Sequence, residues 1–137
     1  MNTPFFPRAI CLLSLVVLVS CSAVYSPYIY DRTAELKTET MTLMNKGTEP
    51  FGKYASKINQ LKVDLESVRQ QEQLRRHNSV KQKQWALQFD STGYLLYGFL
   101  NKWKQDTVLS ETFVSLQRKL VGEAFDLIQE TEKDRSN

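Results

Sequence analysis

Residues that commonly build catalytic and metal sites are scarce in this sequence. Its 137 residues include one histidine, two cysteines, five glycines and four prolines. The histidine lies in the run Arg75-Arg76-His77-Asn78, where neighbouring cations disfavour a metal ion, and there is no glycine-rich phosphate loop. A metal site, a catalytic triad and a nucleotide site are therefore not expected. We assign no catalytic residue, no metal ligand and no enzymatic activity.

Two further features are missing: an excess of one charge and a long apolar run. Lysine and arginine number 18 against 15 acidic residues, too even a balance to indicate nucleic-acid binding. The apolar run from Ala9 to Val19 is interrupted only by Ser14 and is shorter than the roughly 20 residues that a membrane-spanning helix needs. With Arg8 before it and the small Ser20 after it, the run has the parts of an export signal.

The four residues Leu18-Val19-Ser20-Cys21 directly follow this run and resemble a bacterial lipobox. The resemblance to bacterial lipoproteins implies cleavage between Ser20 and Cys21. It also implies a diacylglyceryl group on the thiol of Cys21 and an acyl chain on the new amino terminus. No other cofactor is expected. An ordinary cleaved signal or an uncleaved anchor is the alternative. In this family, Asp directly after the lipidated cysteine favours retention in the inner membrane. This chain has Ser22 at that position, so the resemblance implies the outer membrane, on its periplasmic side.

Lipidation would give the chain a membrane anchor followed by a short tether. Each buried CH₂ contributes roughly 0.8 kcal/mol, so two or more acyl chains hold a protein stably where one does not. Ser26-Pro27 has the pattern of a helix N-cap followed by proline at the first helical position. Residues 22–25 then remain as linker, with a reach of roughly 13 Å. The expected organisation is a cleaved signal (1–20), a lipidated tether (21–26), a helical domain (27–131) and a frayed polar tail (132–137).

The strongest helical pattern is an apolar seam at spacings of three and four residues. Its members are Phe51, Tyr54, Ile58, Leu61, Leu65 and Val68. The same period continues to Glu72 and Arg75, whose charges indicate that the apolar seam stops there. Because the seam is short for a free coiled coil, we predict an intramolecular helical hairpin. Homodimerisation through the seam is the alternative.

Four other helices are expected along the chain. Their approximate ranges are 27–46, 79–89, 94–104 and from Ser110 onward. In the last of these, one stripe is expected from Phe113, Leu116, Leu120, Ala124 and Leu127, and Val114, Val121, Phe125 and Ile128 widen it. In the expected mature chain, no run of alternating apolar and polar residues indicates a β-strand. The fold class is therefore all-α, a small helical bundle of four to five helices built around the second and fifth helices, with Leu61 and Leu65 enclosed by the fifth.

Charge and aromatic residues supply a candidate partner surface. Residues 53–83 are rich in basic groups and residues 106–134 in acidic ones. Pairing of the two segments across solvated flanks is the simpler interpretation. The alternative is that the basic segment binds anionic lipid or an acidic partner. Most aromatic residues of the stretch 85–103 are expected in the core. Tyr94 and Tyr97 fall on a different side of the fourth helix from Trp103, where they could contact a partner. The candidate surface consists of Arg69, Arg75, Arg76, Tyr94 and Tyr97.

The sequence leaves more than one class of function open. The leading hypothesis is a lipid-anchored helical module of the Gram-negative envelope that acts in interaction, assembly or exclusion and has an envelope protein as partner. In layout the chain resembles small helical envelope lipoproteins of unassigned function. The alternative is a structural spacer or lipid-surface protein. A secretion accessory similar to pilotins ranks behind both, because the expected mature chain lacks paired cysteines, and an enzyme ranks last.

Overall fold

The computed structural model describes residues 25–75 and 78–134. Within them the chain forms five α-helices and one 3₁₀ turn. These are α1 (Pro27–Met44), η1 (Phe51–Tyr54), α2 (Ala55–Gln73), α3 (Ser79–Gln88), α4 (Leu96–Asp106) and α5 (Glu111–Lys133). The prediction of a small all-α bundle is confirmed.

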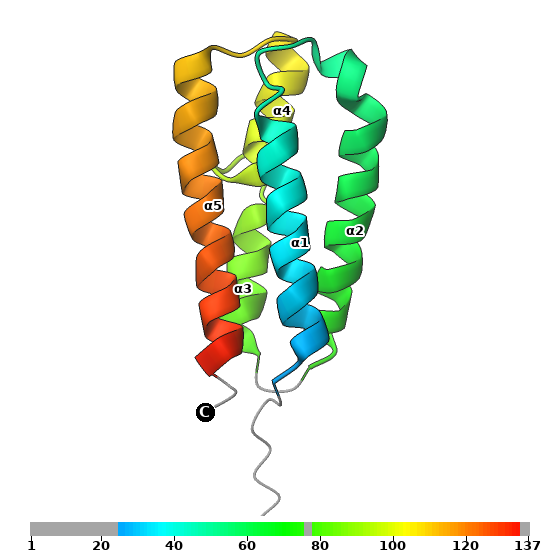
Figure 1. The fold of residues 1–137 in the computed structure, drawn as a ribbon, viewed down its shortest axis with the longest axis vertical. Coiled ribbons are helices and arrows are strands. Elements are labelled where there is room, and N and C mark those ends of the chain that lie inside the picture. Colours follow the sequence, from blue (N-terminus) through cyan, green and yellow to red (C-terminus); the bar gives the residue numbers. More distant parts are fainter. Residues whose placement is uncertain (1–24, 76–77, 135–137) are drawn as a thin grey trace, which may run out of the picture.

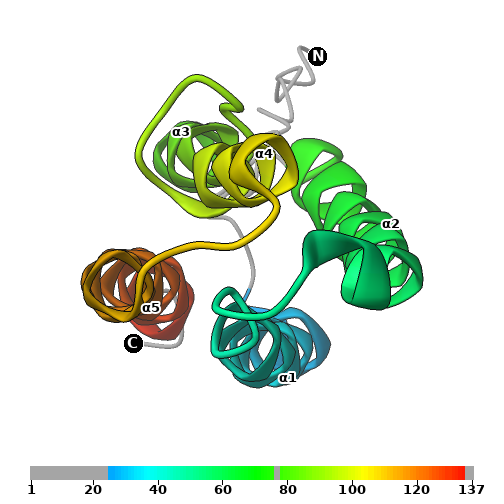
Figure 2. The ribbon, with the colours of Figure 1, turned by 90° about the horizontal axis from the view of Figure 1, so that it is seen from above.

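The helices form four parallel columns, and α3 and α4 share one of them. Figure 1 shows α4 stacked above α3, while α1, α2 and α5 each run along the bundle. Seen from above, α1 lies next to both α2 and α5, and α2 and α5 are diagonally opposite (Figure 2). The closest helix pairs are α1 with α5, α1 with α2, and α3 with α5. The expectation that the bundle is built around the second and fifth helices is therefore wrong, because these two helices lie diagonally opposite (Figure 2) and are not a closely packed pair.

Helix α1 begins as its sequence predicts. The Ser26 hydroxyl accepts a hydrogen bond from the Ile29 N–H at 3.3 Å, and Pro27 occupies the first turn. The buried face of α1 repeats at intervals of three and four residues and includes two threonines. Its members are Ile29, Thr33, Leu36, Thr40, Leu43 and Met44. A helix with such a thin apolar stripe depends on tertiary packing, which α2 and α5 supply from both sides.

The predicted seam of α2 faces the core. Ile58, Leu61, Leu65 and Val68 are buried, as is Tyr54 in the preceding turn. The neighbours that cover this seam are α1 and α3, which flank α2, rather than α5 alone. The intramolecular interpretation of the seam is confirmed by this burial, and the expected enclosure of Leu61 and Leu65 by the fifth helix is corrected.

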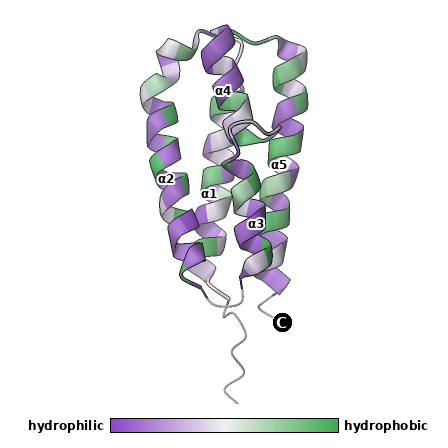
Figure 3. Ribbon diagram, turned by 180° about the vertical axis from the view of Figure 1, so that it is seen from behind, coloured by the Kyte–Doolittle hydropathy of each residue, from purple (hydrophilic) through white to green (hydrophobic). Residues whose placement is uncertain are grey.

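Helix α5 turns a different stripe inward from the one expected. Leu116 and Leu127 are 56% and 54% exposed. The buried face instead consists of Val114, Gln117, Val121, Gly122, Phe125, Ile128 and Glu132. Two apolar stripes lie side by side on this helix, and α1 packs closely at Gly122, where an added Cβ would lie 3.6 Å from the Met41 sulfur. In Figure 3, hydrophobic and hydrophilic segments alternate along the visible side of α5.

The break between α3 and α4 is a turn with specific side-chain contacts. Asp90 accepts hydrogen bonds from the Thr92 backbone N–H at 2.9 Å and the Thr92 hydroxyl at 2.7 Å. The chain then passes so close to Gly98 that a Cβ there would lie 1.9 Å from the Gly93 carbonyl oxygen. Only glycine fits this close approach at position 98. The turn allows α4 to continue the column of α3.

Candidate functional site

Several residues of interest lie outside the described part of the chain. Ser20 and Cys21, the expected cleavage and lipidation residues, fall there, as do Arg76 and His77. Of the expected partner surface, Arg69, Arg75, Tyr94 and Tyr97 are described. The structure places these four in different environments.

A cluster of charged residues is buried at the end of the bundle where α1 begins. The buried charge cluster consists of Glu72, Arg75, Asn78, Lys81 and Glu132. Side chains of Glu72 and Glu132 are 1% exposed and that of Lys81 is 0% exposed. This end joins the start of α1, the end of α2, the start of α3 and the end of α5, which meet at the bottom of Figure 1.

Lys81 and Arg75 each bridge the two carboxylates of the buried charge cluster. The Lys81 ammonium donates to Glu72 at 3.0 Å and also to Glu132. The Arg75 guanidinium donates to Glu72 at 2.7 Å and, through both terminal nitrogens, to Glu132 at 2.9 and 3.0 Å. Two cations thus neutralise two anions, which is the condition under which burial of charge is tolerated.

Polar groups complete the cluster. The Asn78 amide donates to the Glu72 side chain and to the Glu72 carbonyl oxygen, the latter at 3.0 Å. The Ser26 backbone N–H donates to Glu132 at 2.7 Å. All four carboxylate oxygens of Glu72 and Glu132 therefore accept hydrogen bonds. The cluster ties the residue that precedes α1 to the last turn of α5.

The pKa of Glu132 follows from these contacts. Burial by itself raises the pKa, but hydrogen bonds from Arg75, Lys81 and the Ser26 N–H outweigh burial and lower it to about 2. An ionised carboxylate whose oxygens are all engaged is poorly placed to act as a base or nucleophile. The arrangement suits a fixed structural junction.

The buried charge cluster changes the interpretation of Arg75 and of the tail. The Arg75 side chain is only 17% exposed, so it belongs to the junction instead of an open basic surface. The sequence predicts a frayed tail over residues 132–137, but α5 continues to Lys133 and Glu132 is buried, while residues 135–137 lie outside the described part of the chain. Opposite charges of the basic and acidic segments do meet here, in the interior instead of on solvated flanks. The signal was present in the sequence, since Glu72 continues the period of Val68 and Glu132 follows Ile128 by four residues.

Arg69 and Tyr97 belong to a stack of aromatic rings and cations between α2 and the α3–α4 column. This cation–aromatic wall consists of Lys62, Arg69, Phe89 and Tyr97. The Phe89 and Tyr97 ring centroids are 4.7 Å apart. The Arg69 guanidinium lies 4.9 Å from the Phe89 centroid, and the Lys62 ammonium lies 5.1 Å from that of Tyr97. Such contacts stabilise a half-buried surface, so both residues contribute to packing as well as to the outer face.

The electrostatics of the wall follow from its partial burial. Desolvation lowers the pKa of Lys62, and the nearby positive charge of Lys104 lowers it further. Burial raises the pKa of Tyr97, and the Glu66 carboxylate adds to this effect. Glu66 also pairs with Arg69 at 2.7 Å. The wall therefore carries paired and partly desolvated charges.

Tyr94 differs from Tyr97 in being open to solvent. Its residue is 83% exposed, whereas Tyr97 is half-buried. The two tyrosines that the sequence grouped together therefore have different environments. Of the described residues in the expected partner surface, Tyr94 is the most accessible.

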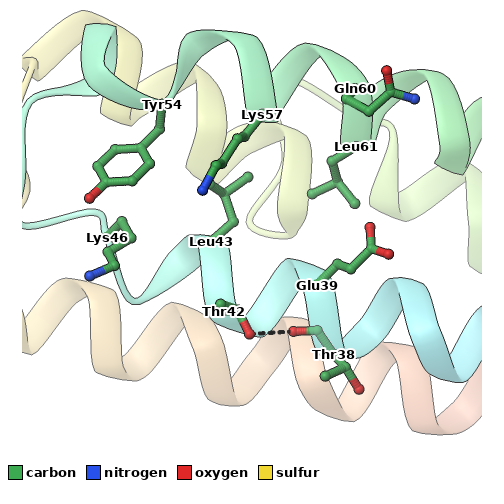
Figure 4. Close-up of a pocket in the computed structure, with 9 residues that line it drawn as sticks. All are labelled: Thr38, Glu39, Thr42, Leu43, Lys46, Tyr54, Lys57, Gln60 and Leu61. Atoms are coloured by element: carbon green, nitrogen blue, oxygen red, sulfur yellow. Dashed lines mark hydrogen bonds between the residues drawn. The ribbon is translucent and has the colours of Figure 1, made fainter.

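A shallow groove lies between α1 and α2, with a volume of about 370 Å³. Leu43, Leu61 and Tyr54 supply its apolar surface (Figure 4). Figure 4 shows Glu39 and Lys57 reaching into the space from opposite helices. Charges of both signs on an apolar base do not select one class of ligand, so we assign no ligand to this groove.

Comparisons with known proteins add no assignment. No family model, curated protein or solved structure matches this chain significantly. Across residues 25–75 and 78–134, no helix combines the length and apolar character needed to cross a bilayer. In the same part of the chain, no three or more histidine, cysteine or carboxylate residues gather in a way that could hold a metal ion.

Proposed function

We propose that this chain is a lipid-anchored protein of the Gram-negative envelope and acts as a helical interaction module without catalysis. The observation that carries the proposal is the lipobox-like sequence ending at Cys21, directly after the apolar run. The structure adds a compatible geometry, because the chain is held in the bundle from Ser26 onward through Glu132. Only residues 22–25 separate the anchor from this junction. On this proposal the protein lies at the periplasmic side of the outer membrane.

Replacement of the anchor residue tests the proposal directly. Cys21→Ser should abolish incorporation of a radiolabelled fatty acid and leave the signal uncleaved, because cleavage follows lipidation in the lipoprotein pattern. Cys11→Ser is the matched control, since Cys11 follows Arg8-Ala9-Ile10, which lacks the lipobox pattern. Label that persists in the Cys21→Ser chain would refute the anchor.

For the interaction role, we propose that Tyr94 and the outer face of the cation–aromatic wall contact an envelope protein. Tyr94 offers an exposed aromatic ring, and the Arg69 side chain, 30% exposed, lies over the Phe89 ring. Aromatic and arginine side chains dominate binding energy at protein interfaces. Arg75 is left out of this surface, because reversing its charge would disrupt the buried charge cluster and confuse binding with folding.

The binding test compares two exposed hydrophobic side chains. Tyr94→Ala should remove a specific envelope protein from the products of crosslinking in cells, while Leu116→Ala, which changes a 56% exposed leucine on α5, should leave those products unchanged. Helical content and membrane association should stay the same in both variants, because surface changes shift stability by about 0.5 kcal/mol or less. If Tyr94→Ala and Arg69→Ala both leave the products unchanged, the spacer role takes precedence.

A further inference from the structure

Three apolar side chains are exposed at the end of the bundle that contains the buried charge cluster. Tyr28, Leu74 and Val80 are 60%, 85% and 58% exposed. They come from the first turn of α1, the C-cap of α2 and the first turn of α3. Side chains in a helix lean toward its N-terminus, so Tyr28 and Val80 lean toward this end. An apolar group is thus present on three of the elements that meet here.

The same end receives the chain from Cys21. Tyr25 is the first described residue and lies beside Tyr30, with ring centroids 6.4 Å apart. From Cys21 to this point the chain can extend roughly 13 Å. On the proposed lipid anchorage, on which this inference rests, the bundle end must therefore stay close to the bilayer surface. Helix α1 has 18 residues and is therefore about 27 Å long, so its other end is well separated from this one.

We propose that this end of the bundle is seated on the bilayer, with Leu74 and Tyr28 placed among the lipid headgroups. The buried charge cluster suits this position, because Arg75 and Lys81 neutralise Glu72 and Glu132 within the protein. The junction therefore keeps its charges paired when water is excluded from the end surface. Exposed aromatic and aliphatic side chains then gain contact with the interfacial region of the lipid.

Fluorescence of single labelled cysteines tests the seating. The mature lipidated chain is reconstituted into vesicles of phosphatidylethanolamine and phosphatidylglycerol, with a polarity-sensitive dye on Leu74→Cys. Controls carry the dye on Val63→Cys, along the side of α2, and on Val108→Cys, at the far end. Spin-labelled lipids should remove most of the emission from position 74 and little from positions 63 and 108. Equal quenching at positions 74 and 108, or none at 74, would overturn the inference.

A second variant tests the contribution of Leu74 to the seating. With the dye on Tyr28→Cys, the additional change Leu74→Asp should cause loss of most lipid quenching, and Val63→Asp should cause none. Flotation of each chain with the vesicles separates the two proposals. A chain that fails to float refutes the lipid anchor itself, whereas a floating chain with unquenched dye at positions 28 and 74 refutes only the seating.

Discussion

The two ends of the bundle are closed by different chemistry. At the end near Ser26, side-chain charges of the buried charge cluster connect α1, α2, α3 and α5. At the far end, backbone groups connect the loops: the Leu109 N–H donates to the Gly47 carbonyl at 2.8 Å and the Phe51 N–H to the Thr107 carbonyl at 2.9 Å. Trp103 adds a bond from its indole N–H to the Glu49 carbonyl at 2.9 Å. Stability at one end therefore depends on paired charge, and at the other on close packing.

The packed end is built mainly from aromatic rings. Trp103 lies 5.5 Å from Phe51, 5.8 Å from Tyr54 and 6.0 Å from Phe99, measured between ring centroids. Such packing does not tolerate added volume, because interiors are close-packed. The charged end should instead be sensitive to loss of a charge, by substitution or by acid.

The largest effect is expected at Lys81. Lys81→Met removes the cation that bridges Glu72 and Glu132 while keeping much of the side-chain volume, and it should lower the free energy of unfolding by about 3 to 5 kcal/mol. Lys83→Met, at an exposed position on the same helix, is the control and should change stability by about 0.5 kcal/mol or less. Urea unfolding measures both. Similar unfolding free energies for the two variants would show that the buried charge cluster contributes little to stability.

Acid should destabilise the charged end. Because the folded-state pKa of Glu132 is about 2, below its ordinary value of 4.5, its contribution is present above pH 4.5 and is lost as the pH falls toward 2. By linkage the loss is about 2 to 3 kcal/mol. Urea unfolding across this range should show a steeper pH dependence in the native chain than in Glu132→Gln. An equal pH dependence of the unfolding free energy in the two chains would contradict the proposed contribution of Glu132.

Added volume should destabilise the packed end. A Cβ on Gly47 would lie 2.8 Å from Val114 and 3.0 Å from Phe99, so Gly47→Ala should cost about 1 to 3 kcal/mol. Gly52→Ala is the matched control, because nothing lies within 4 Å of its added Cβ. Thermal unfolding of both variants makes the comparison. A larger loss from Gly52→Ala would overturn the packing argument.

The smallest effect concerns a feature that both ends share, the serine N-cap. Ser110 accepts a hydrogen bond from the Phe113 N–H at 3.3 Å, as Ser26 does from Ile29. Ser110→Ala and Ser26→Ala should each cost about 1 kcal/mol. In Ser26→Ala the backbone N–H bond to Glu132 remains possible, so the two losses should be similar in thermal unfolding. A much larger loss at Ser26 would indicate that the hydroxyl also supports the cluster.

Local patterns predicted the helical elements well because capping and periodicity are local properties. Ser26-Pro27, Ser110 and the seam from Tyr54 to Val68 all behave as their sequences indicate. The sequence predicts a fourth helix from Tyr94, but the helix begins at Leu96 because the turn at Asp90 and the close approach at Gly98 extend the loop. The errors in the candidate site have a different origin. Arg75 and Tyr97 carry polar groups, which predicts exposure, whereas contacts with residues distant in the sequence, Glu132 and Lys62, partly enclose them.

The sequence by itself determined the helical class, the helix caps and the lipobox-like segment, because each depends on residues close together in the chain. Tertiary structure decided which of two apolar stripes on α5 faces inward, since both have helical spacing and only the positions of α1 and α3 distinguish them. It also decided that Glu72, Lys81 and Glu132 are buried and that Arg75 covers them. A charge enters the interior only when opposite charges from other helices arrive at the same place, and that arrangement exists only in the folded bundle.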